Sequence, residues 1–127
     1  MYVKNISKKL VIGLLFGAVL LVGTSAIAEA QEKAVDNYKL MCVQCHGLAG
    51  TGKGINAPAL AVQPRNHTSA KDMSTLSDDN VFKAIKEGGI AVGKSNQMPA
   101  FGALMSDAEV KDLVKHLRGM CKCKGPA

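Results

Sequence analysis

The stretch "MCVQCHG", Met41 to Gly47, places two cysteines three positions apart and a histidine directly after the second. Three positions are close to one helical turn, so Cys42 and Cys45 would present both thiols on one side of a helix. His46 would be carried beside them. Three interpretations compete at this point: a covalently attached haem, a zinc site and a redox-active dithiol.

Haem explains all three residues. Two thiols one helical turn apart can form thioether bonds to the two vinyl groups of a haem, and a histidine next in sequence is then held under the iron. No other chemistry requires a histidine directly after the second cysteine. We therefore predict one covalent haem c per chain, attached through Cys42 and Cys45, with His46 as the proximal iron ligand.

The two competing interpretations fit less well. A zinc site would use four thiolates, but the second cysteine pair is one residue closer than is usual in zinc knuckles and lies at the other end of the chain. A thioredoxin-like dithiol should lie in a βαβ pattern, and none is visible. Both interpretations remain as alternatives.

The first thirty residues are typical of a secretory signal. A lysine-containing start precedes an uncharged apolar run from Leu10 to Ala28, which ends in the small residues of "TSAIAEA". We predict that residues 1–30 are removed and that the mature chain, 31–127, lies in the periplasm or otherwise outside the cytoplasm. The alternative is a retained membrane anchor, because an apolar run of this length is nearly long enough to span a bilayer.

The size and charge of the mature chain limit its function. Residues 31–127 suffice for one domain, and their 13 Lys and Arg against 9 Asp and Glu leave a net charge of about +4. This excess is spread along the chain, which argues against nucleic-acid binding and fits weak docking to acidic protein surfaces. With only Tyr38, Phe82 and Phe101 as aromatic residues, the core would be thin unless a bound group fills its middle.

The apolar pattern predicts an all-α protein with long loops. A first helix is expected over about 32–44, a short helical turn near Ala70, and a helix that follows Ser77 as N-cap and stops at Gly88-Gly89. Glycines and Pro58 mark the stretch after His46 as a loop. No alternating run is convincing as a strand.

The last helix has the clearest signals. Ser106 and Glu109 form a capping-box pattern, and Met105 and Val110 are placed for a hydrophobic staple across it. We expect this helix to end at Gly119. Its apolar stripe is formed by Val110, Leu113, Val114 and Leu117. The side expected to face solvent carries Lys111, Asp112, Lys115 and Arg118.

At this point the chain resembles the class I c-type cytochromes, over essentially Glu32 to Arg118. The resemblance rests on "CVQCH", "NAPAL", "QMPAFG" and the flanking helices. It implies a cytochrome c-like fold, in which three to five helices wrap around one covalently bound haem. It also implies that Tyr38 packs where the first and last helices cross, against Leu113 and Leu117.

The resemblance further implies the remaining site residues. In the family, a proline carbonyl after the haem motif accepts the Nδ1–H of the proximal histidine, and Pro58 occupies that place. Met98 is the expected distal iron ligand, with Pro99 stiffening the chain after it. Arg65, in "QPRN", resembles a family position near the haem propionates, although it could equally be an exposed loop arginine.

Other residues could replace Met98. His67 would give a bis-histidine site, but a loop histidine is more often simply solvated. Met73 and Met120 are interpreted as core residues, and Met41 is expected on the wrong side of the ring because it adjoins Cys42.

The C-terminal tail, residues 119–127, departs from the family pattern because it contains Cys121 and Cys123. A disulfide between them would close a tight ring. The alternatives are a disulfide to a partner, a metal contact, or a thiolate that replaces Met98 on the iron.

The resemblance implies a single-electron carrier that is not an enzyme and that docks transiently with redox protein donors and acceptors. Alternatives are a haem module that binds or senses nitric oxide or carbon monoxide, and a small haem subunit of a larger oxidoreductase. A membrane contact would require that the signal segment is retained. Five lysines could encircle the haem edge or be plain solubilising charges: Lys39, Lys53, Lys83, Lys86 and Lys94.

Overall fold

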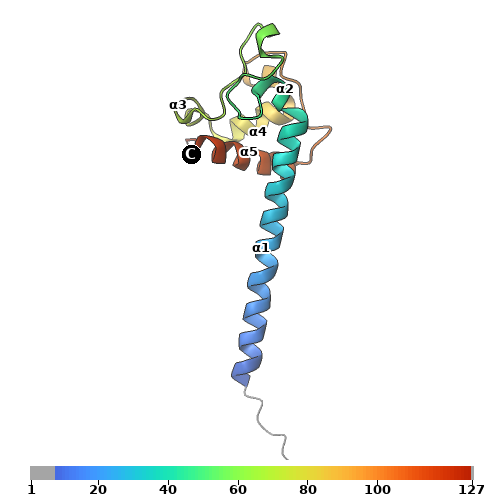
Figure 1. Cartoon of the computed structure of the whole chain (residues 1–127), viewed down its shortest axis with the longest axis vertical. Helices are drawn as coiled ribbons and strands as arrows, with labels where there is room; N and C mark the ends of the chain where they lie inside the picture. The colour runs from blue at the N-terminus through green and yellow to red at the C-terminus, as the bar shows by residue number, and fades with distance from the viewer. Residues whose placement is uncertain (1–7, 127) are drawn as a thin grey trace, which may run out of the picture. The chain divides into compact units, whose positions relative to one another are not determined.

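The computed structural model describes residues 8–126, with side chains from residue 25 onward. Within this range the chain is helical and contains no strand, which confirms the all-α prediction (Figure 1). In chain order the elements are α1 (Lys8–Met41), α2 (Val43–His46), the 3₁₀ turn η1 (Ala57–Ala59), α3 (Ala70–Met73), α4 (Asp78–Glu87), the 3₁₀ turn η2 (Gly89–Val92) and α5 (Asp107–Cys121).

The chain divides into two compact units, Met1–Ala30 and Gln31–Ala127. The boundary falls where the sequence predicts the end of the signal, although processing itself stays a prediction. The first seven residues of that predicted signal lie outside the described residues. In the range that the structure does describe, no helix combines the length and the apolar character needed to cross a membrane.

The path into the cysteine motif is helical with one interruption. The sequence predicts a helix over about 32–44, whereas α1 ends at Met41 and a separate turn, α2, begins at Val43. The interruption is slight, because the N–H of Cys42 still bonds the Tyr38 carbonyl and the N–H of His46 still bonds the Cys42 carbonyl, both at 2.9 Å. The chain then turns away at Gly47, which has a φ of +79°.

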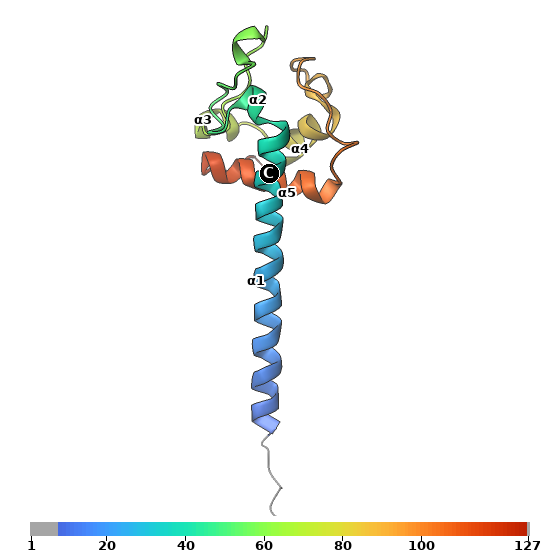
Figure 2. The same cartoon turned by 45° about the vertical axis from the view of Figure 1, so that its right-hand side comes forward.

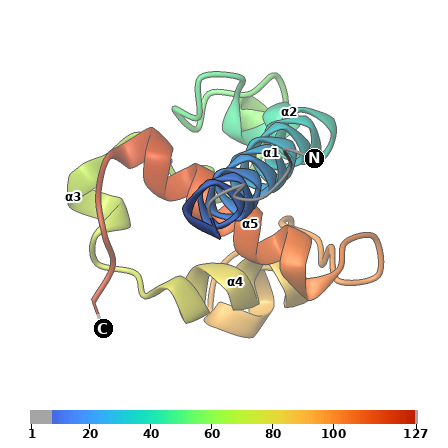
Figure 3. The same ribbon diagram turned by 90° about the horizontal axis from the view of Figure 1, so that it is seen from below.

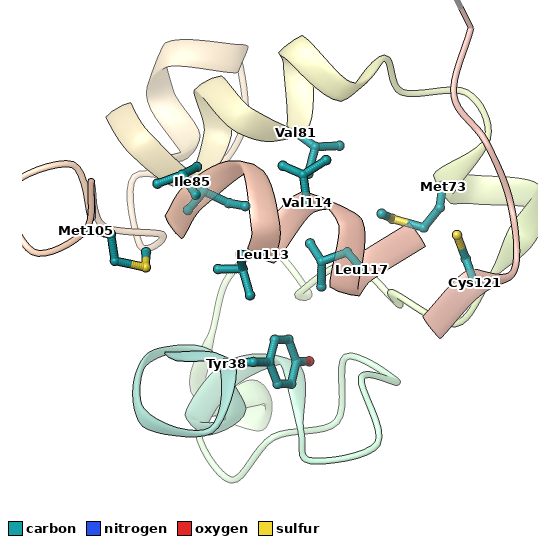
Figure 4. Close-up of a cluster of buried hydrophobic side chains, with 10 residues drawn as sticks. Tyr38, Met73, Val81, Ile85, Met105, Leu113, Val114, Leu117 and Cys121 are labelled. Atoms are coloured by element: carbon teal, nitrogen blue, oxygen red, sulfur yellow. The ribbon is translucent and has the colours of Figure 1, made fainter. Parts of the chain in front are cut away.

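The core lies between α4, α5 and the end of α1. Helix α4 runs beside α5, and α3 lies near the C-terminal part of α5 (Figure 3). Val81 and Ile85 of α4 are buried toward α5, while Tyr38 of α1 faces α5 from the other side (Figure 4). Tyr38, Leu113 and Leu117 belong to one buried cluster, as the resemblance predicts.

Helix α5 begins as predicted and ends later. Ser106 and Glu109 form both hydrogen bonds of the capping box. The predicted end at Gly119 is wrong: the helix continues to Cys121, and Lys122 caps it in the left-handed region with a φ of +50°. Burial of Cys121 in the core, where it is 4% exposed, favours the extra helical residues.

Arg118 does not belong to the solvent-exposed side of α5, which corrects the expectation. Only 12% of its side chain is exposed, and its guanidinium donates to the Asp78 carboxylate and the Met73 carbonyl, both at 2.7 Å, and to the Leu76 carbonyl. A planar guanidinium with several donors suits such a set of acceptors. Arg118 thus ties α5 to the segment between α3 and α4.

Candidate haem-binding site

Helix α2 presents the cysteine motif to a large cavity. The cavity has a volume of about 560 Å³, and Cys42, Cys45 and His46 all line it. Both cysteines are free thiols and half-buried. Burial, followed by the charge of Cys45, raises the pKa of Cys42 to about 12, so this thiol is neutral near pH 7.

The rest of the cavity wall is mainly apolar. Its lining includes Met73 from α3, Val81 and Ile85 from α4, and Leu113 and Leu117 from α5. These residues are buried by their neighbours and still face the cavity, so the core is open at its centre. The volume lies within the range of about 300–1,000 Å³ typical of cofactor pockets. A flat, mostly apolar group with two attachment points next to Cys42 and Cys45 fits this space.

The His46 ring is oriented by a backbone carbonyl. Its Nδ1 lies 2.9 Å from the Arg65 carbonyl oxygen, so Nδ1–H donates to that oxygen and Nε2 is left as the nitrogen with a free lone pair. Burial lowers the pKa of His46, and the hydrogen bond to Arg65 opposes this. His46 is therefore held as a neutral imidazole, the form that binds iron.

The acceptor for His46 is Arg65 and not Pro58, which corrects the prediction. Pro58 is exposed in η1 and does not line the cavity. Arg65 replaces Pro58 as the acceptor because of the path that the chain takes after the motif. Gly52 has a φ of +78°, and an ideal Cβ there would collide with the Pro64 carbonyl. Residues 64–65 therefore pass close to the loop that follows His46. The carbonyl next to Pro64 therefore takes the predicted role.

Arg65 also has a side chain at the site. It is half-buried and lines the cavity, and its Nη1 donates to the Asp72 carbonyl at 3.3 Å. The side chain is thus not a free surface arginine. A contact with haem propionates remains a prediction.

His67 is buried, against the expectation that it is solvated. It is 8% exposed, and its ring stacks on that of His46 with centroids 4.1 Å apart and planes 17° apart. Its Nδ1 lies 3.3 Å from the Tyr38 hydroxyl. Burial, followed by repulsion from His46 whenever that ring is protonated and then by the positive charge of Arg65, lowers the pKa of His67 to about 3.

Met98 lines the cavity as predicted for a distal ligand, in the segment after η2. It is half-buried, and its carbonyl accepts the Gly89 N–H at 3.0 Å. Gly89 needs to be glycine, because a Cβ there would collide with the Ser95 carbonyl and press on the Met98 side chain. Met98 as an iron ligand stays a prediction. Met41, expected to face away, also lines the cavity.

The five lysines expected around the haem edge are not gathered at the cavity. Of the five, only Lys94 lines it. Lys39 pairs with Asp36 at 3.4 Å and Lys86 pairs with Asp107 at 2.6 Å, so both are engaged elsewhere. The notion of a complete lysine ring is therefore not supported.

Cys121 and Cys123 form a disulfide with each other. They are thus separate from the free thiols of Cys42 and Cys45, and the four-thiolate zinc arrangement does not form. No group of three or more His, Cys, Asp or Glu side chains suited to a metal ion occurs in the described part of the chain.

A thiol pair and a neutral imidazole on one wall of an apolar cavity, inside this helical fold, define a small c-type cytochrome. The chain belongs to the family described as cytochrome C oxidase, cbb3-type, subunit III, which matches residues 29–117. As a c-type cytochrome it carries haem c and has an electron-transfer function.

Solved structures agree with this assignment. The KustC0563 c-type cytochrome is 26% identical, with a TM-score of 0.55 over 68% of this chain and 95% of its own. A chain of the Kuenenia stuttgartiensis reducing HAO-like protein complex Kustc0457/Kustc0458 is 21% identical, with a TM-score of 0.55 over 70% of this chain. This chain spans 41% of that second protein, whose likeness shows the fold alone. No curated protein matches the sequence significantly.

Two contributors to the site escape sequence reasoning. A backbone carbonyl such as that of Arg65 can come from any residue type, so only the fold identifies it. His67 could have been suspected from its place two residues after Arg65, but its burial depends on the return of the chain beneath His46.

Proposed function

We propose that the protein is a periplasmic single-electron carrier with one haem c per chain, bound by Cys42 and Cys45 and ligated by His46 and Met98. The observation that carries the proposal is the single cavity wall formed by both free thiols and the oriented imidazole, with a thioether elsewhere in the lining. The bound haem would supply a one-electron ferrous–ferric couple.

The residues of the chain would set the properties of that couple. The Arg65 carbonyl holds the ring of His46 and strengthens it as a donor. Met98 offers a soft, neutral sulfur, which favours ferrous iron and raises the reduction potential. With His46 and Met98 as ligands in both the ferrous and the ferric state, little would rearrange on each electron transfer.

The proposed partners are redox proteins that dock briefly. The net charge of the predicted mature chain is about +4, which favours acidic partner surfaces. Transient redox complexes use small interfaces, so a partner can leave quickly. Electron transfer in this scheme leaves no substrate chemically altered, and we infer that the protein acts without an enzymatic activity of its own.

The haem proposal is tested with the full chain exported from a host that attaches haem c. We expect the alkaline pyridine spectrum of haem c and an intact mass with one haem per chain. Cys42→Ala and Cys45→Ala should each lose one thioether bond, and Cys123→Ala should retain both. Colourless protein with both Cys42 and Cys45 open to alkylation would refute the proposal.

The ligand assignment is tested separately. Met98→Ala should abolish the long-wavelength sulfur–iron absorption band of the ferric protein, whereas Met120→Ala, outside the cavity lining, should retain it. Rapid carbon monoxide binding by the wild-type ferrous protein would show an open iron position and favour a gas-binding module.

A role as the haem subunit of a larger oxidoreductase is the second candidate. It is favoured by the description of the family as an oxidase subunit. Stable co-purification with a larger redox protein from native membranes or periplasm would support it. A monomer in native extracts would support the free carrier.

A further inference from the structure

Two segments that line the cavity are joined by one side chain. The Gln97 Oε1 accepts the Ala61 N–H at 3.0 Å, across 36 positions of sequence. The first segment follows η1 and lines the cavity with Leu60 and Val62, and the second lines it with Gln97 and Met98. Among the described residues, no other hydrogen bond connects the two segments. Both segments lie on the same side of α5 (Figure 2).

The Gln97 side chain is presented by a fixed turn. The Ser95 hydroxyl accepts the Gln97 N–H at 3.0 Å, and the Met98 N–H reaches the Ser95 carbonyl at 3.4 Å. The N–H of Gly89, the first residue of η2, donates to the Met98 carbonyl at 3.0 Å. The segment is therefore anchored to η2, and beyond Met98 the Phe101 N–H bonds the Ile85 carbonyl of α4 at 3.0 Å. Among the described residues, Gln97 makes the one hydrogen bond between this segment and the segment after η1.

We propose that Gln97 is a positioning residue that acts as a latch, holding the Met98 segment across the cavity so that external ligands cannot reach the haem iron. The proposal rests on the proposed ligation by Met98. The Met98 segment has a closed and an open arrangement. The Gln97–Ala61 hydrogen bond forms only in the closed arrangement and therefore stabilises it.

The size of the effect follows from the strength of one hydrogen bond. A single neutral hydrogen bond near the surface favours the closed arrangement by a factor of about two to ten. An external ligand binds only the open form, so its apparent affinity rises in proportion to the open fraction. Removing the latch should therefore raise ligand affinity about two- to tenfold without removing Met98.

The test is imidazole binding by the ferric holoprotein, followed through the sulfur–iron band. Gln97→Leu, which has no acceptor, should bind imidazole about two- to tenfold more tightly than the wild type and retain the band in its absence. Gln97→Glu retains an oxygen acceptor and should stay near wild type. Equal affinity of Gln97→Leu and wild type would overturn the latch.

Gln63→Leu is the matched control. Its amide lines the same cavity, but donates within its own segment, to the Ala57 carbonyl at 3.1 Å and the Leu60 carbonyl at 3.2 Å. It should change imidazole affinity less than Gln97→Leu. An equal or larger effect would show that loosening of either segment suffices and would overturn the specific role of Gln97.

Met98→Ala distinguishes a failure of the proposed iron ligation by Met98 from a failure of the proposed Gln97 latch. If this variant loses the band and binds imidazole tightly while Gln97→Leu behaves as wild type, the ligand assignment stands and the latch is refuted. If Met98→Ala retains the band, the ligand assignment fails, and the latch fails with it.

Discussion

Tyr38 has one hydroxyl proton and two polar neighbours, the carbonyl of the half-buried Gly47 and the buried ring of His67. Its oxygen lies 3.1 Å from the Gly47 carbonyl and 3.3 Å from the Nδ1 of His67. A carbonyl can only accept, so the hydroxyl donates to Gly47 and Nδ1–H of His67 must donate to the hydroxyl. The single phenol thus fixes the tautomer of His67, whose ring supports His46. Burial also raises the pKa of Tyr38, which keeps the phenol protonated.

Tyr38→Phe should lower the free energy of unfolding by about 1–3 kcal/mol, because it leaves the buried Nδ1–H of His67 without this partner, whereas the Gly47 carbonyl still accepts the Gly50 N–H at 2.9 Å. Denaturant unfolding of the holoprotein measures this. In a His67→Leu background, Tyr38→Phe should lower the free energy of unfolding by less, because the imidazole that bonds the Tyr38 hydroxyl is already absent. Equal costs in both backgrounds would mean that the Tyr38–His67 contact contributes nothing.

At the level of single residues, the sequence predicts what chemistry requires of a side chain. Cys42, Cys45 and His46 were found because their spacing serves one purpose, and the structure places all three at the cavity. Pro58 was assigned by resemblance alone, and the Arg65 carbonyl has the role in its place. Backbone groups leave no signature in a sequence, so this kind of error is inherent.

The first turn of α5 carries an ionised carboxylate, that of Glu109. The Glu109 carboxylate accepts from the Ser106 hydroxyl at 2.6 Å and the Ser106 N–H at 2.8 Å, and it pairs with Lys33 of α1 at 3.0 Å. The Ser106 hydroxyl, then the Ser106 N–H, then Lys33 hold the pKa of Glu109 at about 2. This carboxylate therefore joins α5 to the predicted mature part of α1.

Glu109→Gln should change the pH dependence of stability in one window. The folded pKa of about 2 lies below the ordinary value of 4.5, so the unfolded chain takes up the proton first as pH falls. The stabilisation by Glu109 is therefore complete above pH 4.5 and is lost progressively toward pH 2. Denaturant unfolding of the variant and the wild type should show a stability gap near pH 6 that closes across this window.

Ser106→Ala provides the control for this explanation. Without the hydroxyl, the largest cause of the lowered pKa of Glu109 is absent. In the Ser106→Ala background, the stability gap caused by Glu109→Gln should therefore shrink. A gap of constant size from pH 6 to pH 2 would contradict the assigned origin.

Elements with complete local signals were predicted best. Ser77 caps α4 by accepting the Asn80 N–H at 3.1 Å, and the start of α5 follows its capping box. The predicted end of α5 at Gly119 was wrong because packing outweighs the local sequence signal there. Glycine permits a helix to end, but the burial of Cys121 two residues later favours its continuation. The break at Cys42 also has no sequence signal, since ordinary helical hydrogen bonds continue across it.

At the scale of the whole molecule, composition predicted a thin core with a bound group in its middle. The predicted mature domain has only three aromatic residues, and core residues line a cavity of about 560 Å³. Sequence could not predict how the loops close this cavity, because the Gln97–Ala61 contact depends on two irregular segments meeting. Turn residues mark such segments as loops but do not determine their path.

Residues 1–30 should be replaceable by another cleavable secretory signal without effect on the haem domain. Among residues 25–33, which have described side chains and precede Ala34, none is buried, so this stretch adds no buried residue to the core. We expect one haem per chain and the wild-type denaturation midpoint for the replaced form, and an intact mass that begins near Gln31 for the natural one. Unprocessed natural protein held in the membrane, together with a replaced form that fails to retain haem, would show that the segment is a retained anchor on which the domain depends.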